Sequence, residues 1–64
     1  MPCGTYTETD IPAADLDEVL AGIALDTPTN VTKTQQPNGD WTVVATFPPC
    51  PAGQPQTTTK VHGA

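Results

Sequence analysis

Hydrophobic and polar residues alternate most regularly in residues 30–47, NVTKTQQPNGDWTVVATF, which hold the only Trp and the only Phe of the chain. Two runs rich in Thr and Val, residues 29–36 and 40–47, flank the sequence PNGD at 37–40. β-Branched residues favour strands, proline sets φ for the first corner of a tight turn, and Asn and Gly tolerate positive φ. The pattern predicts a β-hairpin, and we expect the rest of the chain to pack around it.

Two turns fit the hairpin, and they differ by one residue in register, which moves one strand's side chains to the opposite face. A type I′ turn would place only Asn38 and Gly39 in the loop. A type I turn with Pro37 at its first corner would end in a bulge at Gly39. The bulged register alone puts Val31 on the face of Trp41 and the other apolar residues. Burial therefore favours the bulged hairpin, with Trp41 in the core rather than exposed as a binding aromatic.

A helical period precedes the hairpin. Apolar residues recur at i, i+3, i+4 and i+7, as Leu16, Val19, Leu20 and Ile23. Pro12 suits the first turn of a helix, and the residue before Pro28 avoids the α region. We predict a helix from about residue 12 to 23 or 24. The alternating sequence CGTYTE at residues 3–8 predicts a short strand before it.

Proline is concentrated after the hairpin. Four prolines occur within eight residues, at Pro48, Pro49, Pro51 and Pro55. They disfavour helix and central strand and favour an extended, polyproline-like path. The sequence QTTTKVH at 56–62 suits either an added strand or a free tail, and both readings stay open. We therefore divide the chain into a small domain, residues 1–47, and a Pro/Thr-rich arm or tail, residues 48–64.

The order strand, helix, strand, strand predicts a small α+β domain in which one helix packs on a three-stranded sheet. The crossover through the helix makes the first two strands parallel, and the third is antiparallel to both. If the first strand pairs with the third, Cys3 lies beside Cys50. A chain of 64 residues buries few side chains and is marginally stable without a staple. The sequence predicts neighbouring cysteines, as a disulfide or as two thiols.

The chain is acidic, with a formal net charge of −5 and a pI near 4.1. This charge argues against nucleic acid and anionic membrane as partners. Six of the seven acids lie between residues 8 and 26, as on a solvated helix face or on a surface that meets a basic partner. No apolar run has the length of a membrane span, and residues 1–5 lack the features of a secretory signal. We expect a cytoplasmic or virion location.

Little catalytic chemistry is available, because the sequence contains no Ser, no Arg and one His. Cys3 or Cys50 with His62 would form the one thiol–base pair, but all three lie in terminal segments. The same three residues are fewer than the four ligands of a closed zinc site and lack its paired spacing. We therefore expect no enzyme activity, no cofactor and no metal.

These features predict a non-enzymatic structural or protein-interaction component, such as a phage assembly or virion protein. We expect a protein partner, a homo-oligomer or a larger assembly. The expected partner-binding arm consists of Pro48, Pro49, Pro51, Gln54 and Pro55. The alternative is a peptidase inhibitor that presents residues 48–55 as a proline-stiffened loop anchored by Cys50, since a preorganised loop favours binding.

Overall fold

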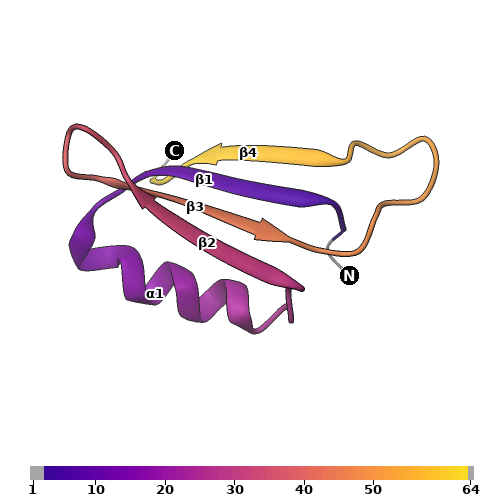
Figure 1. The fold of residues 1–64 in the computed structure, drawn as a ribbon, viewed down its shortest axis with the longest axis horizontal. Helices are drawn as coiled ribbons and strands as arrows, with labels where there is room; N and C mark the ends of the chain where they lie inside the picture. The colour runs from indigo at the N-terminus through magenta and orange to yellow at the C-terminus, as the bar shows by residue number, and fades with distance from the viewer. Residues whose placement is uncertain (1–2, 64) are drawn as a thin grey trace.

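The computed structural model describes residues 3–63 as one helix packed on a four-stranded mixed sheet, an α+β fold (Figure 1). Its elements are β1 (Thr5–Ile11), α1 (Ala13–Ala24), β2 (Asn30–Gln35), β3 (Trp41–Thr46) and β4 (Thr57–Val61). The strand order is β2-β3-β1-β4. Strand β3 is antiparallel to both β1 and β2, and β4 is parallel to β1. The predicted parallel relation of the first two strands is therefore confirmed.

The hairpin has the predicted bulged register. Val31 pairs with Ala45, and Gln35 pairs with Trp41. The Gly39 amide donates a hydrogen bond of 3.0 Å to the carbonyl of residue 36, and its φ is 92°. Asn38 is not in the positive-φ region, which a type I′ turn would require. Val31 shares the helix side of the sheet but is 37% exposed, because β2 is an edge strand whose residues are all exposed.

The predicted helix is also confirmed, and its apolar stripe faces the sheet. Leu16 and Ile23 are buried on α1, while Val19 and Leu20 are half-buried. Trp41 is half-buried against this core, with the Lys33 ammonium 5.9 Å from its ring centroid. The buried core cluster comprises Ile11, Leu16, Ile23, Val43, Ala45 and Phe47.

The first strand runs further than predicted, through Ile11 rather than ending at residue 8. Its pairing with β3 shifts between Glu8 and Ile11, and Asp10 has a φ of 58° within this irregularity. The Gln36 amide holds Asp10 in place, accepting from its backbone N–H and donating to its carboxylate, both at 2.8 Å. The bulge turns Ile11 into the core, where it is 0% exposed. The predicted end of the strand at residue 8 was therefore wrong by three residues.

The structure adds a fourth strand to the three predicted. After β3 the chain crosses over the start of β1 and returns as β4 on its far side (Figure 1). Gly4 lies under this crossing, donating to the Pro48 carbonyl at 2.8 Å, while the Thr5 amide donates to the Gln56 carbonyl at 2.7 Å. Part of the predicted arm, residues 57–61, is therefore a strand of the same sheet.

The sheet face turned away from α1 is rich in threonine. Side chains alternate between the two faces along each strand, and residues paired across neighbouring strands share a face. This face therefore carries Thr5, Thr7 and Val44 together with the residues that pair with them. Its members are Thr5, Thr7, Thr9, Asn30, Thr32, Thr34, Thr42, Val44, Thr46, Thr57, Thr59 and Val61. None of them is charged, but the exposed Asp10 carboxylate lies at the end of this face, where Gln36 links it to the Thr42 hydroxyl.

Candidate functional site

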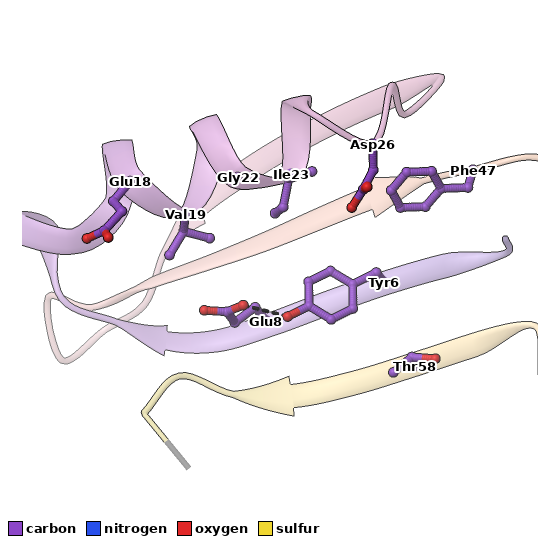
Figure 2. A pocket seen from close by; sticks show the side chains of 9 residues that line it. All are labelled: Tyr6, Glu8, Glu18, Val19, Gly22, Ile23, Asp26, Phe47 and Thr58. Carbon is purple, nitrogen blue, oxygen red and sulfur yellow. Dashed lines mark hydrogen bonds between the residues drawn. The ribbon is translucent and has the colours of Figure 1, made fainter. Parts of the chain in front are cut away.

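A pocket of about 360 Å³ lies between α1 and the β1–β4 half of the sheet (Figure 2). Its lining combines apolar side chains with three carboxylates. The lining residues are Tyr6, Glu8, Glu18, Val19, Gly22, Ile23, Asp26, Phe47 and Thr58. Ligand pockets in proteins have volumes of about 300–1,000 Å³, and this one lies near the lower end of that range.

The fold places these residues by simple periodicity. Alternation along β1 turns Tyr6 and Glu8 toward the helix side, and the parallel pairing with β4 sets Thr58 beside Tyr6. On α1, Val19 and Ile23 are four residues apart and therefore share one face. The pocket is thus formed where the helix covers the sheet only in part.

Gly22 keeps the helix side of the pocket open. It is exposed in the last turn of α1, and a Cβ added there would meet no atom within 4 Å. Glycine is a poor helix former, so helix propensity alone does not account for this residue. The missing side chain instead leaves the pocket accessible from the solvent.

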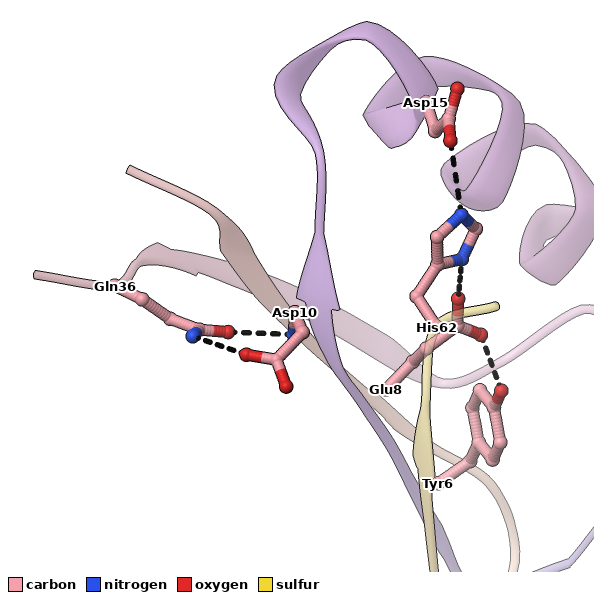
Figure 3. Close-up of polar contacts among 6 residues, drawn as sticks. All are labelled: Tyr6, Glu8, Asp10, Asp15, Gln36 and His62. Carbon is pink, nitrogen blue, oxygen red and sulfur yellow. Dashed lines mark hydrogen bonds and ion pairs between the residues drawn. The ribbon is translucent and has the colours of Figure 1, made fainter. Parts of the chain in front are cut away.

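A chain of polar contacts joins β1 to α1 at the end of the pocket lined by Glu8 (Figure 3). The Tyr6 hydroxyl donates to Glu8 at 2.5 Å, and the other Glu8 oxygen accepts from His62 Nδ1 at 2.6 Å. His62 Nε2 lies 3.1 Å from the Asp15 carboxylate on α1. Carboxylates only accept hydrogen bonds, so this geometry requires an N–H on both ring nitrogens of His62. The chain ties β1, α1 and the residue after β4 together.

The polar chain shifts the pKa values of Tyr6, Glu8 and His62. Burial and the hydrogen bond to charged Glu8 raise the pKa of Tyr6 to about 12. Burial raises the pKa of Glu8, but hydrogen bonds from Tyr6 and His62 and the charges of His62 and Lys60 outweigh it and lower that pKa overall. The hydrogen bonds to Glu8 and Asp15 raise the pKa of His62. The chain therefore favours a charged Glu8 and a charged His62.

The side chains considered for thiol–base chemistry already have other partners in this structure. Both His62 nitrogens are occupied by carboxylates, which leaves neither free to exchange a proton with a substrate. Cys3 and Cys50 form a disulfide, so neither is a free thiol. Within residues 3–63, no cluster of three or more His, Cys, Asp or Glu is arranged to hold a metal ion.

The predicted cysteine neighbours lie where the chain crosses the start of β1. Cys3 and Cys50 are 47 residues apart in sequence, yet their Cα atoms are 4.9 Å apart and their sulfurs are bonded. Gln56 fixes the same point, because its amide accepts from the Cys50 N–H at 2.9 Å and donates to the Cys50 carbonyl at 3.0 Å. Cys50 is a buried anchor for an exposed loop.

The predicted partner-binding arm forms this loop. Its members Pro48, Pro49, Pro51, Gln54 and Pro55 are all exposed. The extended path does not continue through the tip of the loop. There the Gln54 amide donates to the Pro51 carbonyl at 3.2 Å, and Gly53 has a φ of 92°, which makes a tight turn. The arm lies outside the pocket, so the structure separates the two surfaces.

The sequence did not reveal the pocket or the polar chain. Tyr6 and Glu8 alternate on a predicted strand, but His62 joins them only because β4 pairs in parallel with β1. A register that pairs residues 52 positions apart, such as Tyr6 with Thr58, leaves no local pattern. The one usable signal was the crowding of acids between residues 8 and 26, which contains every carboxylate of the site.

Comparisons with protein-family models, with curated proteins and with solved structures found no match to this chain. In the described part of the chain, α1 is too short and too polar to cross a membrane.

Proposed function

We propose that the protein is a non-enzymatic interaction component that binds a partner protein at the pocket between α1 and the β1–β4 half of the sheet. The observation that carries this proposal is the lining itself. Val19, Ile23 and Phe47 supply an apolar floor, while Glu18 and Asp26 at the rim are exposed. An apolar centre inside a polar rim is the usual anatomy of a protein interface.

The disulfide bears on where such a component is located. Disulfides persist in oxidising environments and are rare in a reducing cytoplasm, so the bond between Cys3 and Cys50 favours a virion over the cytoplasm. The narrower expectation of a phage assembly or virion protein stays a prediction. Mass spectrometry of purified particles from the source tests it, with the chain expected at stoichiometric amount.

A pair of bulky substitutions on adjacent helix positions tests the pocket. Gly22→Trp would fill the pocket, whereas Ala21→Trp adds the same side chain to an exposed position outside the lining. We expect a partner captured from source extract by the wild type and by Ala21→Trp to be lost with Gly22→Trp. Circular dichroism establishes that both variants are folded. Equal capture by the two variants would contradict docking at this pocket.

The alternative function, peptidase inhibition, draws support from the loop anchored at Cys50 by the disulfide and by Gln56. The tight turn between Pro51 and Gln54 argues against it, because it interrupts the extended segment that a protease cleft would bind. Assays with a panel of serine and cysteine proteases decide the matter. If micromolar protein slows a protease, and the Gly22→Trp variant slows it equally, the inhibitor function would be favoured.

A further inference from the structure

We infer that the pocket recognises an extended basic segment of the pattern basic–any–apolar–any–basic, an inference that rests on the proposed function. The floor formed by Val19, Ile23 and Phe47 would take the central apolar side chain. The carboxylates of Glu18 and Asp26 would take the two flanking cations.

The spacing of the two rim carboxylates sets the pattern. Glu18 and Asp26 approach the pocket from its two ends along the helix (Figure 2). Asp26 lies two residues beyond the end of α1, but Leu25 keeps helical φ and ψ and the Asp26 amide donates to the Ile23 carbonyl at 3.0 Å. The eight positions from Glu18 to Asp26 therefore advance by about 12 Å at 1.5 Å per helical residue. In an extended chain, residues i and i+4 are about 13 Å apart at 3.3 Å per residue, and i, i+2 and i+4 point the same way. One extended segment therefore matches both carboxylates and the floor between them.

The charges nearest the pocket leave these two acids available. Within residues 3–63 the ion pairs are those of His62 with Glu8 and with Asp15, so neither Glu18 nor Asp26 has a basic partner there. Lys60 lies beside Glu8, at the end of the pocket where the polar chain lies. The incoming cations would thus neutralise acids that this chain leaves uncompensated.

The distribution of charge over the molecule selects a basic partner over a second copy. The chain carries a net charge of −5, so two copies repel each other and a basic segment is attracted. The threonine-rich face has one carboxylate at its end, that of Asp10, and Gln36 already donates a hydrogen bond to it. The pocket instead has three carboxylates in its lining, so the helix side is the face that attracts cations. Charge and shape therefore point to the same place.

Short peptides test this inference directly. The probe is an acetylated, amidated peptide containing Lys-Thr-Leu-Thr-Lys, titrated into ¹⁵N-labelled protein. Controls contain Glu-Thr-Leu-Thr-Glu, Lys-Thr-Thr-Thr-Lys, or the two lysines three positions apart. We expect saturable shifts of the Gly22 and Thr58 amides with the probe, and weaker or no binding with each control.

Matched acid variants locate the charge contacts. Glu18→Gln and Asp26→Asn should each lower the affinity for the probe peptide about 1.5- to 5-fold, which is the range for one exposed ion pair. Asp17→Asn removes one exposed negative charge next to Glu18 on α1 but lies outside the lining, and should leave affinity unchanged. Gly22→Trp should abolish binding.

Several results would overturn the inference. These are binding of the threonine peptide as tight as the leucine peptide, equal weakening by all three acid variants, or shifts confined to amides outside the pocket. Absence of any binding at millimolar peptide would overturn it as well. The capture experiment separates the two proposals. If Gly22→Trp loses partner capture while the peptides give any of these results, the pocket remains the docking site and the basic ligand class is rejected. Failure of both tests would reject both proposals.

Discussion

At the scale of single residues, the buried carboxylate of Glu8 is the most demanding feature of the structure. It is 6% exposed and charged, and it is accommodated because Tyr6 and His62 both donate to it. A buried ion without such partners would be strongly destabilising. The stability of the pocket therefore depends on complete hydrogen bonding around one side chain.

Replacing Glu8 with Ala should lower the free energy of unfolding by about 1–3 kcal/mol, because the Tyr6 hydroxyl and His62 lose their shared acceptor. Urea denaturation followed by Trp41 fluorescence measures the change. Glu18→Ala is the matched control, since Glu18 is exposed and should shift stability by no more than about 0.5 kcal/mol. Equal effects of the two substitutions would show that the polar chain does not stabilise the fold.

The same residues predict how stability depends on pH. The pKa of Glu8 is lowered on folding, so its contribution is present above the unfolded pKa of about 4.3 and is lost as the pH falls through the folded value. The pKa of His62 is raised, so its contribution is complete below about 6.5 and is lost as the pH rises through the folded value. Both contributions coincide at about pH 5–6.

We therefore expect stability to be greatest near that window, and a decline between pH 6 and 8 that His62→Asn removes. His62 is the one His of the chain, and both cysteines are bonded, so His62→Asn isolates the histidine contribution in this interval. Urea unfolding of the two proteins across pH 3–9 measures the difference. If the free energy of unfolding changes equally with pH in both proteins between pH 6 and 8, a charged His62 that bridges Glu8 and Asp15 in the folded protein is contradicted.

At the scale of elements, local patterns determined the hairpin and the helix, and nonlocal pairing determined the rest. The hairpin register followed from Pro37 and Gly39, and the helix face from the spacing of Leu16 and Ile23. The end of β1 was misread because Pro12 resembles a helix start, while the bulge at Asp10 depends on Gln36, 26 residues away. The parallel pairing of β4 depends on backbone bonds at the crossing, which leave no periodic signal.

The crossing over Gly4 makes a prediction at this scale. Gly4 has a φ of 74°, and a Cβ there would lie 2.2 Å from the Gln56 carbonyl oxygen. Gly4→Ala should therefore lower the free energy of unfolding by about 1–3 kcal/mol, as overpacking does. Gly22→Ala is the opposite control, because its Cβ meets nothing within 4 Å, and it should raise helix stability by about 0.5–1 kcal/mol. Denaturant midpoints of both variants measure this, and a neutral Gly4→Ala would argue against the close crossing.

At the scale of the whole molecule, one covalent bond links the N-terminal segment to the loop between β3 and β4. The disulfide joins Cys3, two residues before β1, to Cys50 in this loop. Closing a loop of this length contributes about 4 kcal/mol in the chain-entropy model. That is comparable with the total stability of a small domain, about 5–15 kcal/mol. The sheet is therefore expected to depend on the bond for its fourth strand and for much of its stability.

Reduction should lower the melting temperature by about 15–30 °C, since 1 kcal/mol corresponds to about 4–8 °C in a domain of this size. Differential scanning calorimetry with and without reductant measures the shift, and intact mass with maleimide trapping counts the free thiols. A variant with Ala at both Cys3 and Cys50 controls for other effects of the reductant, and its melting temperature should match that of the reduced protein and stay the same when reductant is added. Two freely labelled thiols in the native protein, with melting unchanged by reductant, would show that the bond is absent and that the thin core alone stabilises the sheet.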